Sequence, residues 1–275
     1  MVRLSWLAVL TVGVLLAGCG STEQVVTMTP EQRFEKAKAL YDAGDYLEAI
    51  NEFTVITLQH QGSSVAPDAQ YYIGECRFAR GEYLLAAFEY SIVRRNYTAS
   101  AKAADAQYKT GLSYFYYSPS YKLDQQYTKK AIDELQAFVE YYPSHPMAVD
   151  ASNKIRELNN RLAEKQYRTA QLYARMGSYR AALNSFDIVL EKYHDSDYAP
   201  AAVLDKADLL MQRNRSQEAA TLLKEFVTKF PNNVLVSRAK EMLQTLERQQ
   251  QKGSSPSKDS GDRRGAGNAE AKTAG

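Results

Sequence analysis

The side chains best suited to catalysis or metal binding are few and scattered. The three histidines, His60, His145 and His194, fall at the predicted ends of helices in separate parts of the chain, without the spacing of a metal site. No Gly-x-Ser-x-Gly motif, phosphate-binding loop or His-Glu-x-x-His motif occurs. Asp205 and Asp208 share a predicted helix face, where solvated charge is the ordinary explanation. The sequence therefore predicts a protein that is not an enzyme and that holds no metal or other cofactor.

Binding chemistry is better represented, because aromatic side chains recur every 37 residues in the first half of the chain. One series is Phe34, Tyr71 and Tyr108, and the other is Tyr41, Phe78 and Phe115. Charged residues such as Glu75 and Lys109 lie beside these positions. Rings interleaved with a few charges are suited to holding an extended peptide, and a lysine can pair with a peptide carboxylate.

A sequence repeat positions these rings. Gly44–Ala49 returns as Gly81–Ala86 and again as Gly177–Ala182, and a fourth copy keeps the spacing with Asn214 in place of the glycine. The first and last intervals are 37 residues, close to the roughly 34 of the tetratricopeptide repeat, which folds as helix, turn, helix. Each glycine fits the end of the first helix of a pair, where the chain needs a positive φ.

Small residues recur where the first helix of each pair would cross its partner, at Ala37, Gly74, Gly111 and Ala170. A single pair cannot bury its hydrophobic face, so the pairs must stack around a continuous core. We therefore predict an all-α fold, a right-handed superhelix of about five tetratricopeptide repeats with a C-terminal capping helix. Nothing in the sequence indicates strands.

Breakers and shifts in composition divide the chain into five predicted parts. These are a signal peptide (1–18), a lipidated cysteine with a flexible tether (19–29), repeats 1–3 (30–146), a long linking helix with repeats 4 and 5 and the capping helix (147–249), and a disordered tail (250–275). Repeat 3 carries an insertion near 118–126.

Counting along the first helix of each repeat gives the positions that line a tetratricopeptide groove. The predicted peptide-binding groove comprises Phe34, Tyr41, Tyr71, Glu75, Phe78, Tyr108, Lys109, Leu112 and Phe115. For its rings the alternative is simple packing between repeats. In the second half, the candidate partner-docking residues are Arg175, Arg180, Arg213 and Arg215. For each arginine the alternative is a solvated helix face or helix end.

The N-terminus has the features of an export signal. Arg3 precedes an apolar run from Leu4 to Leu16, which is too short to span a bilayer. The segment ends in Leu16-Ala17-Gly18-Cys19, which resembles the lipobox of bacterial lipoproteins, where the cysteine receives acyl chains, palmitate among them. The alternative is an ordinary signal peptide with a chance cysteine. A lipidated Cys19 would anchor the protein stably in a membrane.

The lipobox, tether, repeats and long linking helix together resemble the BamD family of outer-membrane β-barrel assembly lipoproteins. Three local stretches, Asp124–Ala131, Phe138–Pro143 and Arg161–Tyr167, are similar to the family pattern. The similarity covers about residues 30–248. Arg94–Ser100 departs from it, because a Pro-x-His-Pro junction found there in some relatives is absent.

The resemblance implies a lipid-anchored protein on the periplasmic face of the outer membrane. It also implies that the C-terminal repeats dock on a periplasmic POTRA domain of BamA, and that the N-terminal repeats receive the C-terminal segments of unfolded outer-membrane proteins. Other assembly lipoproteins are further candidate partners. Barrel precursors typically end in an extended segment with a terminal aromatic residue, which an aromatic groove suits.

Two other classes of function are weighed against this one. A periplasmic tetratricopeptide adaptor that coordinates cell-envelope or peptidoglycan assembly is the alternative, although such proteins usually carry an ordinary signal peptide and a coiled coil. A nucleic-acid partner is not expected, because the formal net charge is only +2 and no basic stripe stands out.

Overall fold

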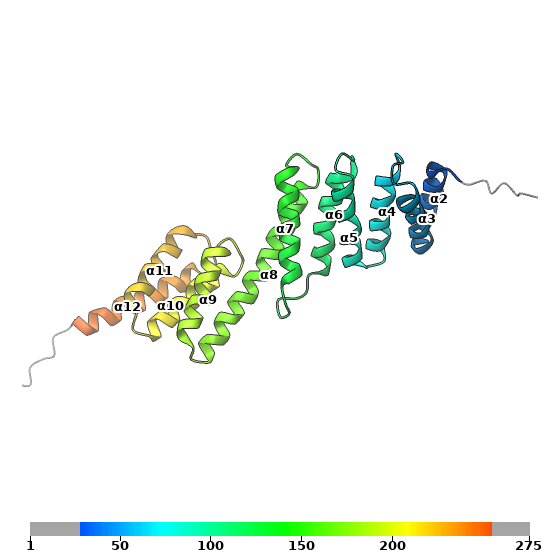
Figure 1. The fold of residues 1–275 in the computed structure, drawn as a ribbon. Coiled ribbons are helices and arrows are strands. Elements are labelled where there is room, and N and C mark those ends of the chain that lie inside the picture. The colour runs from blue at the N-terminus through cyan, green and yellow to red at the C-terminus, as the bar shows by residue number, and fades with distance from the viewer. Residues whose placement is uncertain (1–27, 255–275) are drawn as a thin grey trace, which may run out of the picture. The chain divides into compact units, whose positions relative to one another are not determined.

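The computed structural model describes residues 28–254, apart from the side chains of 250 and 252–254, and these residues form helices without strands. Figure 1 labels α2 (Pro30–Ala43), α3 (Tyr46–Gln59), α4 (Ala66–Ala79), α5 (Tyr83–Asn96), α6 (Lys102–Tyr117), α7 (Gln126–Tyr141), α8 (Ala148–Arg175), α9 (Tyr179–Lys192), α10 (Ala199–Gln212), α11 (Ser216–Lys229) and α12 (Val236–Ser254). The all-α prediction is confirmed. The predicted signal peptide, Cys19 and the chain beyond 254 lie outside the described residues.

Local sequence sets the ends of the helices. Thr29 caps α2, because its hydroxyl accepts a hydrogen bond from the backbone N–H of Gln32 while the Gln32 side chain accepts one from the Thr29 N–H. The repeated glycines have the predicted left-handed backbone, with φ of 86° at Gly44 and 74° at both Gly81 and Gly177. Asn214 takes this conformation in the fourth copy, with φ of 58°. Asparagine tolerates it better than most side chains do.

The predicted close approach of paired helices is confirmed at two glycines. A Cβ added to Gly74 would lie 2.6 Å from the Tyr90 ring, and one added to Gly111 would lie 2.7 Å from the Leu135 side chain. Glycine at these positions therefore lets α4 pack against α5, and α6 against α7, at a separation that any side chain would widen.

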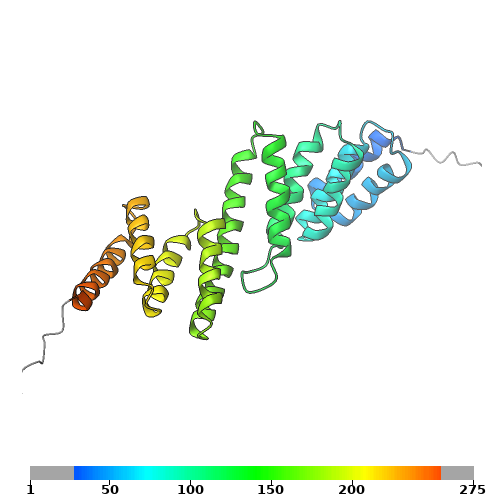
Figure 2. The ribbon, with the colours of Figure 1, turned by 60° about the vertical axis from the view of Figure 1, so that its left-hand side comes forward.

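The described helices fall into two compact units, which divide within α7 and within α8. Unit 1 comprises residues 28–117 and 133–151. In it, α2 to α6 lie side by side in two views turned by 60° (Figure 1 and Figure 2). Its largest fully buried side chains include Phe53, Tyr90 and Phe138. The predicted boundary, between 146 and 147, lies near the division in α8.

Unit 2 comprises residues 118–132 and 152–254. Its core contains Phe186, Leu204, Leu223 and Leu246, which are almost completely buried. α12 continues to Ser254, five residues beyond the predicted end at 249, so the tail predicted from 250 begins too early. The reason is that no helix breaker precedes Gly253.

The predicted insertion is an ordered loop in unit 2, Ser118–Gln125. Buried Gln125 donates hydrogen bonds from its side-chain amide to the backbone carbonyls of Ser120 and Leu123. Two cations of α8 also hold the loop: Arg161 donates to Ser118, and Lys165 donates to the Leu123 carbonyl at 2.7 Å. The extra residues thus close on themselves and on α8.

Candidate functional site

Glu75 on α4 lies at the centre of the predicted groove residues. Its Oε1 accepts a hydrogen bond from the Tyr90 hydroxyl of α5 at 2.6 Å, and Lys109 Nζ of α6 lies 2.9 Å from the same oxygen. The side chains of Glu75 and Lys109 are 14% and 24% exposed. Three helices from two repeats therefore meet at one carboxylate. The ammonium predicted to meet a peptide carboxylate has Glu75 as its partner in the structure.

Three rings lie beside this ion pair, and we call them the aromatic rim: Phe78, Tyr83 and Tyr116. Lys109 Nζ lies 5.2 Å from the centroid of Phe78, a cation–π distance. Phe78 contacts Tyr83 and Tyr116 edge-on at centroid distances of 5.2 and 5.6 Å, and those two tyrosines stack at 5.4 Å. Tyr116 is 51% exposed. Sequence reasoning missed Tyr83 and Tyr116, although Tyr83 belongs to the repeated glycine motif.

The groove residues of the first repeat are half-buried and pack on the core. Tyr41 contacts Tyr46 and Tyr72 edge-on at 5.7 and 5.2 Å. The Phe34 ring lies 5.4 Å from that of Phe53 and 5.9 Å from that of Tyr72. Phe34 and Tyr41 therefore pack against neighbouring rings, as expected if the rings of the predicted groove simply pack between repeats.

Three more predicted groove residues, Tyr71, Tyr108 and Leu112, are buried. The Tyr108 hydroxyl donates to Asp150, and its ring lies 5.4 Å from Phe138. Phe115 is half-buried and meets Tyr116 edge-on at 5.5 Å. Of the nine predicted residues, Phe78 and Phe115 therefore contact the exposed ring of Tyr116, and Lys109 lies over the ring of Phe78.

Burial fixes the protonation of the phenols around Glu75. It raises the pKa of Tyr41 to about 12, and the negative charge of Glu75 adds to the shift. Burial likewise raises the pKa of Tyr71 and of Tyr90 far above the usual value, again with a contribution from Glu75. These hydroxyls stay protonated at neutral pH, so Tyr90 acts as a permanent donor to Glu75.

The four candidate docking arginines are exposed residues of unit 2. The Arg213 guanidinium lies 4.5 Å from the centroid of the Tyr179 ring. Arg215 donates two hydrogen bonds, of 2.7 and 2.6 Å, to Glu218. Arg175 lines a pocket that Tyr179 also lines, and Arg180 is exposed on α9.

Neither metal binding nor thiol chemistry finds support in the described residues. Among them, no group of three or more His, Cys, Asp or Glu side chains could hold a metal ion. Burial raises the pKa of the Cys76 thiol to about 12, which leaves it protonated and unreactive at neutral pH. None of the described helices has the length and apolar character needed to cross a bilayer.

A polar contact that sequence reasoning missed recurs inside the repeats of unit 1, and we call it the clamp. A donor on the first helix of each pair reaches a glutamate on the second. The pairs are Arg33 with Glu52, Gln70 with Glu89, and Gln107 with Glu134. Each glutamine also donates to the backbone carbonyl of its glutamate. The donors at 33, 70 and 107 are 37 residues apart, and so are Glu52 and Glu89. This 37-residue recurrence is the sequence signal from which the clamp could have been predicted.

Comparison with known proteins agrees with the resemblance seen in the sequence. The model of the outer membrane lipoprotein family YfiO, which includes BamD, matches residues 26–221. The chain belongs to this family. Two relatives are named outer membrane protein assembly factor BamD. The protein of Rickettsia prowazekii is 24% identical over 242 residues, covering 87% of this chain and 96% of its own. That of Caulobacter vibrioides is 24% identical over 218 residues, covering 78% and 72%.

Among solved structures, the TPR2AB-domain:pHSP90 complex of yeast Sti1 is 16% identical to this BamD-family chain. The alignment covers 81% of this chain and 84% of the other, with a TM-score of 0.44.

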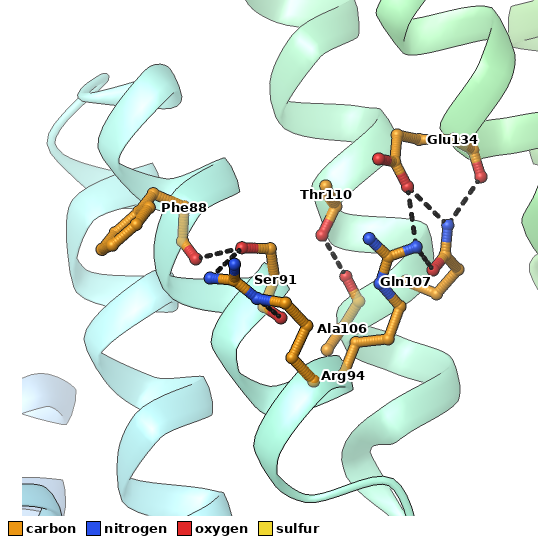
Figure 3. Close-up of polar contacts among 8 residues, drawn as sticks. Phe88, Ser91, Arg94, Ala106, Gln107, Thr110 and Glu134 are labelled. Atoms are coloured by element: carbon orange, nitrogen blue, oxygen red, sulfur yellow. Dashed lines mark hydrogen bonds and ion pairs between the residues drawn. The ribbon is translucent and has the colours of Figure 1, made fainter.

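In this member of the BamD family, the stretch Arg94–Ser100 begins with a residue that bridges two repeats. Arg94 on α5 donates to Gln107 on α6 at 2.8 Å and lies 3.3 Å from the carboxylate of Glu134 on α7 (Figure 3). Arg94 thereby connects the second repeat to the clamp that Gln107 and Glu134 form within the third repeat. The neighbouring Arg95 turns back along its own helix to Ser91.

Proposed function

We propose that this chain is a non-enzymatic scaffold and receptor lipoprotein of the outer-membrane β-barrel assembly complex. In this proposal Cys19 carries the lipid anchor, unit 1 receives unfolded outer-membrane protein precursors, and the C-terminal repeats dock on a periplasmic POTRA domain of BamA. Membership of the family and the similarity to the BamD assembly factors of Rickettsia prowazekii and Caulobacter vibrioides support the assembly role.

The observation that carries the receptor role is the ion pair of Lys109 and Glu75 beside the aromatic rim. A precursor that ends in an aromatic residue offers a ring and a carboxylate close together. The rim offers an exposed tyrosine face, and Lys109 offers an ammonium beside it. Since Tyr90 also holds Glu75, Lys109 can share its charge with a second carboxylate without leaving Glu75 unbonded.

A peptide titration tests the receptor role. The double variant Phe78→Ala with Tyr116→Ala removes half-buried and exposed rings, whereas truncation of Tyr71 or Tyr108 would remove buried ones. We expect the double variant Phe78→Ala with Tyr116→Ala to weaken binding of a barrel C-terminal peptide about tenfold or more while helicity is retained. The matched control is Phe88→Ala with Tyr141→Ala, which removes exposed rings elsewhere in unit 1. Equal affinity in all three proteins would contradict the receptor role.

Affinity purification from gently solubilised envelopes tests the docking role. The anchored protein should bring down BamA in stoichiometric amount, and Cys19→Ser serves as the unanchored comparison. Recovery of cell-wall synthesis proteins without BamA would instead favour the envelope adaptor.

A further inference from the structure

Unit 2 contains a pocket of about 390 Å³, and one of the candidate docking arginines, Arg175, is among the residues that line it. It opens among α8, α9 and α10. The residues that line it include Ala174, Arg175, Tyr179, Phe186, Asp205 and Asp208. The volume is within the range of small-molecule and side-chain sites. We call it the α8–α10 pocket.

The pocket exists because a ring that other repeats supply is missing. In the first repeat Tyr41, four residues after the small Ala37, packs against Tyr46. In the second, Phe78 packs against Tyr83 in the same way. The fourth repeat has Ala174 at this position.

A second aromatic side chain that fills the corresponding space between the first two repeats is also missing here. Between the first two repeats Tyr72 stacks on Phe53 at 5.6 Å and meets Tyr41 edge-on at 5.2 Å. Phe186 is the repeat equivalent of Phe53, and Asp205 is that of Tyr72. The two positions that fill the space in the first repeats are thus an alanine and an aspartate here.

The polar groups of the pocket select what could fill it. Asp205 already accepts hydrogen bonds from the Tyr167 hydroxyl and the Gln171 amide, at 2.7 and 3.0 Å. Asp208 is exposed and accepts one from Gln212 at 2.7 Å. A carboxylate offers about four acceptor positions, so Asp208 can take a further donor.

The guanidinium groups beside this pocket offset the charge of its two aspartates. Arg175 lines it, and Arg213 lies over the ring of Tyr179. These two guanidinium groups oppose the attraction of Asp205 and Asp208 for an entering lysine or arginine, so charge alone does not select a cation. An aromatic ring with a hydroxyl matches both the missing rings and the open acceptor.

We propose that the α8–α10 pocket binds a tyrosine side chain presented by a partner polypeptide. The ring takes the space between Ala174 and Phe186, and its hydroxyl donates to Asp208. This inference goes beyond the precursor groove of unit 1. It does not depend on BamA being the docking partner.

Amide chemical shifts of the isotope-labelled full-length protein in detergent micelles test the proposal, with N-acetyl-tyrosinamide as the probe. We expect shifts confined to residues around Ala174, Tyr179 and Asp208. N-acetyl-phenylalaninamide should bind about tenfold more weakly, because it lacks the hydroxyl. Tighter binding of N-acetyl-argininamide, or no shift with the tyrosine probe at its solubility limit, would overturn the proposal.

Two variants separate this site from adventitious binding. Ala174→Phe restores the ring of the other repeats and should abolish the shifts, whereas Leu172→Phe, on exposed α8 surface, should leave them unchanged. Asp208→Ala should remove the tenfold preference for the hydroxyl while phenylalaninamide binds as before. Unaltered tyrosinamide binding by both pocket variants would refute the assignment. Helical circular dichroism establishes that each variant is folded.

Discussion

At the residue scale, Glu75 has donors of two kinds, phenol hydroxyls and an ammonium group. The Tyr90 hydroxyl comes from a buried side chain and is fixed, whereas Lys109 ends on a flexible stem that is partly exposed. A charge on a flexible stem can turn to a new anion at small cost in contacts. Glu75 therefore holds the Lys109 ammonium in place, and the ammonium can still turn to the carboxylate of a bound peptide.

Glu75→Gln should strengthen binding of a barrel C-terminal peptide, because Lys109 loses its internal counter-ion while Tyr90 keeps a hydrogen-bond acceptor. We expect a several-fold gain for the free-acid peptide and little change for the amidated one. Fluorescence anisotropy of the two labelled peptides measures the difference. An equal gain for both peptides would show that the terminal carboxylate does not reach Lys109.

Gly111→Ala should destabilise the protein by up to about 2 kcal/mol. The added methyl would meet the buried Leu135 side chain at 2.7 Å, and overpacking of that kind costs about 1–3 kcal/mol. Alanine recovers about 1 kcal/mol of helix propensity. Gly62→Ala, at an exposed position with nothing within 4 Å, is the control and should change little. Urea unfolding compares them, and equal midpoints would contradict the close approach.

At the element scale, the ends of most helices could be predicted because glycine, proline and asparagine mark them. The end of α12 could not, since no such signal precedes Gly253. The exposure of the candidate groove residues could be predicted only in part. The rings recur in the sequence, but their exposure depends on neighbours far along the chain, as with Tyr108, which Phe138 and Asp150 cover. Spacing alone cannot reveal that.

The clamp of Gln107 and Glu134 should behave as one unit in unfolding experiments. Gln107→Ala removes the amide donor of the Glu134 carboxylate, which keeps Arg94 as a partner, so we expect a cost of about 0.5–1.5 kcal/mol. A double-mutant cycle with Glu134→Ala should give a coupling energy of about 0.5 kcal/mol or more. Gln136→Ala, an exposed glutamine on the same helix as Glu134, is the matched control. Additive effects of the two clamp variants would contradict a direct interaction.

At the scale of the whole molecule, paired carboxylates make stability depend on pH. A hydrogen bond from Lys36, with Arg33 also contributing, holds the pKa of Glu52 below its ordinary 4.5. Arg77 and Arg80 do the same for Glu82. Because the folded-state pKa is depressed, this stability is present above about pH 4.5 and is lost as pH falls through the folded value.

We therefore expect the urea midpoint to fall steadily as pH drops below about 4.5. Glu52→Gln should lower the free energy of unfolding at neutral pH by about 1 kcal/mol or less, and the urea midpoint should fall with it. The decrease of the midpoint with falling pH, which we call the acid slope, should become less steep. Glu48→Gln, which changes an exposed glutamate of the same helix, serves as the control. An unchanged acid slope in Glu52→Gln would mean that the ion pairs of Glu52 do not contribute to the pH dependence of stability.

The Arg94 bridge has a consequence for how unit 1 comes apart. Repeat proteins unfold approximately as a row of units, each coupled only to its nearest neighbours, and the strength of each coupling decides how many units open together. Arg94 ties the second repeat to Gln107 and Glu134 of the third. These two repeats should therefore exchange their amide hydrogens as one cooperative block, which keeps the helices that carry Glu75 and Lys109 in register while the ends of the row fray.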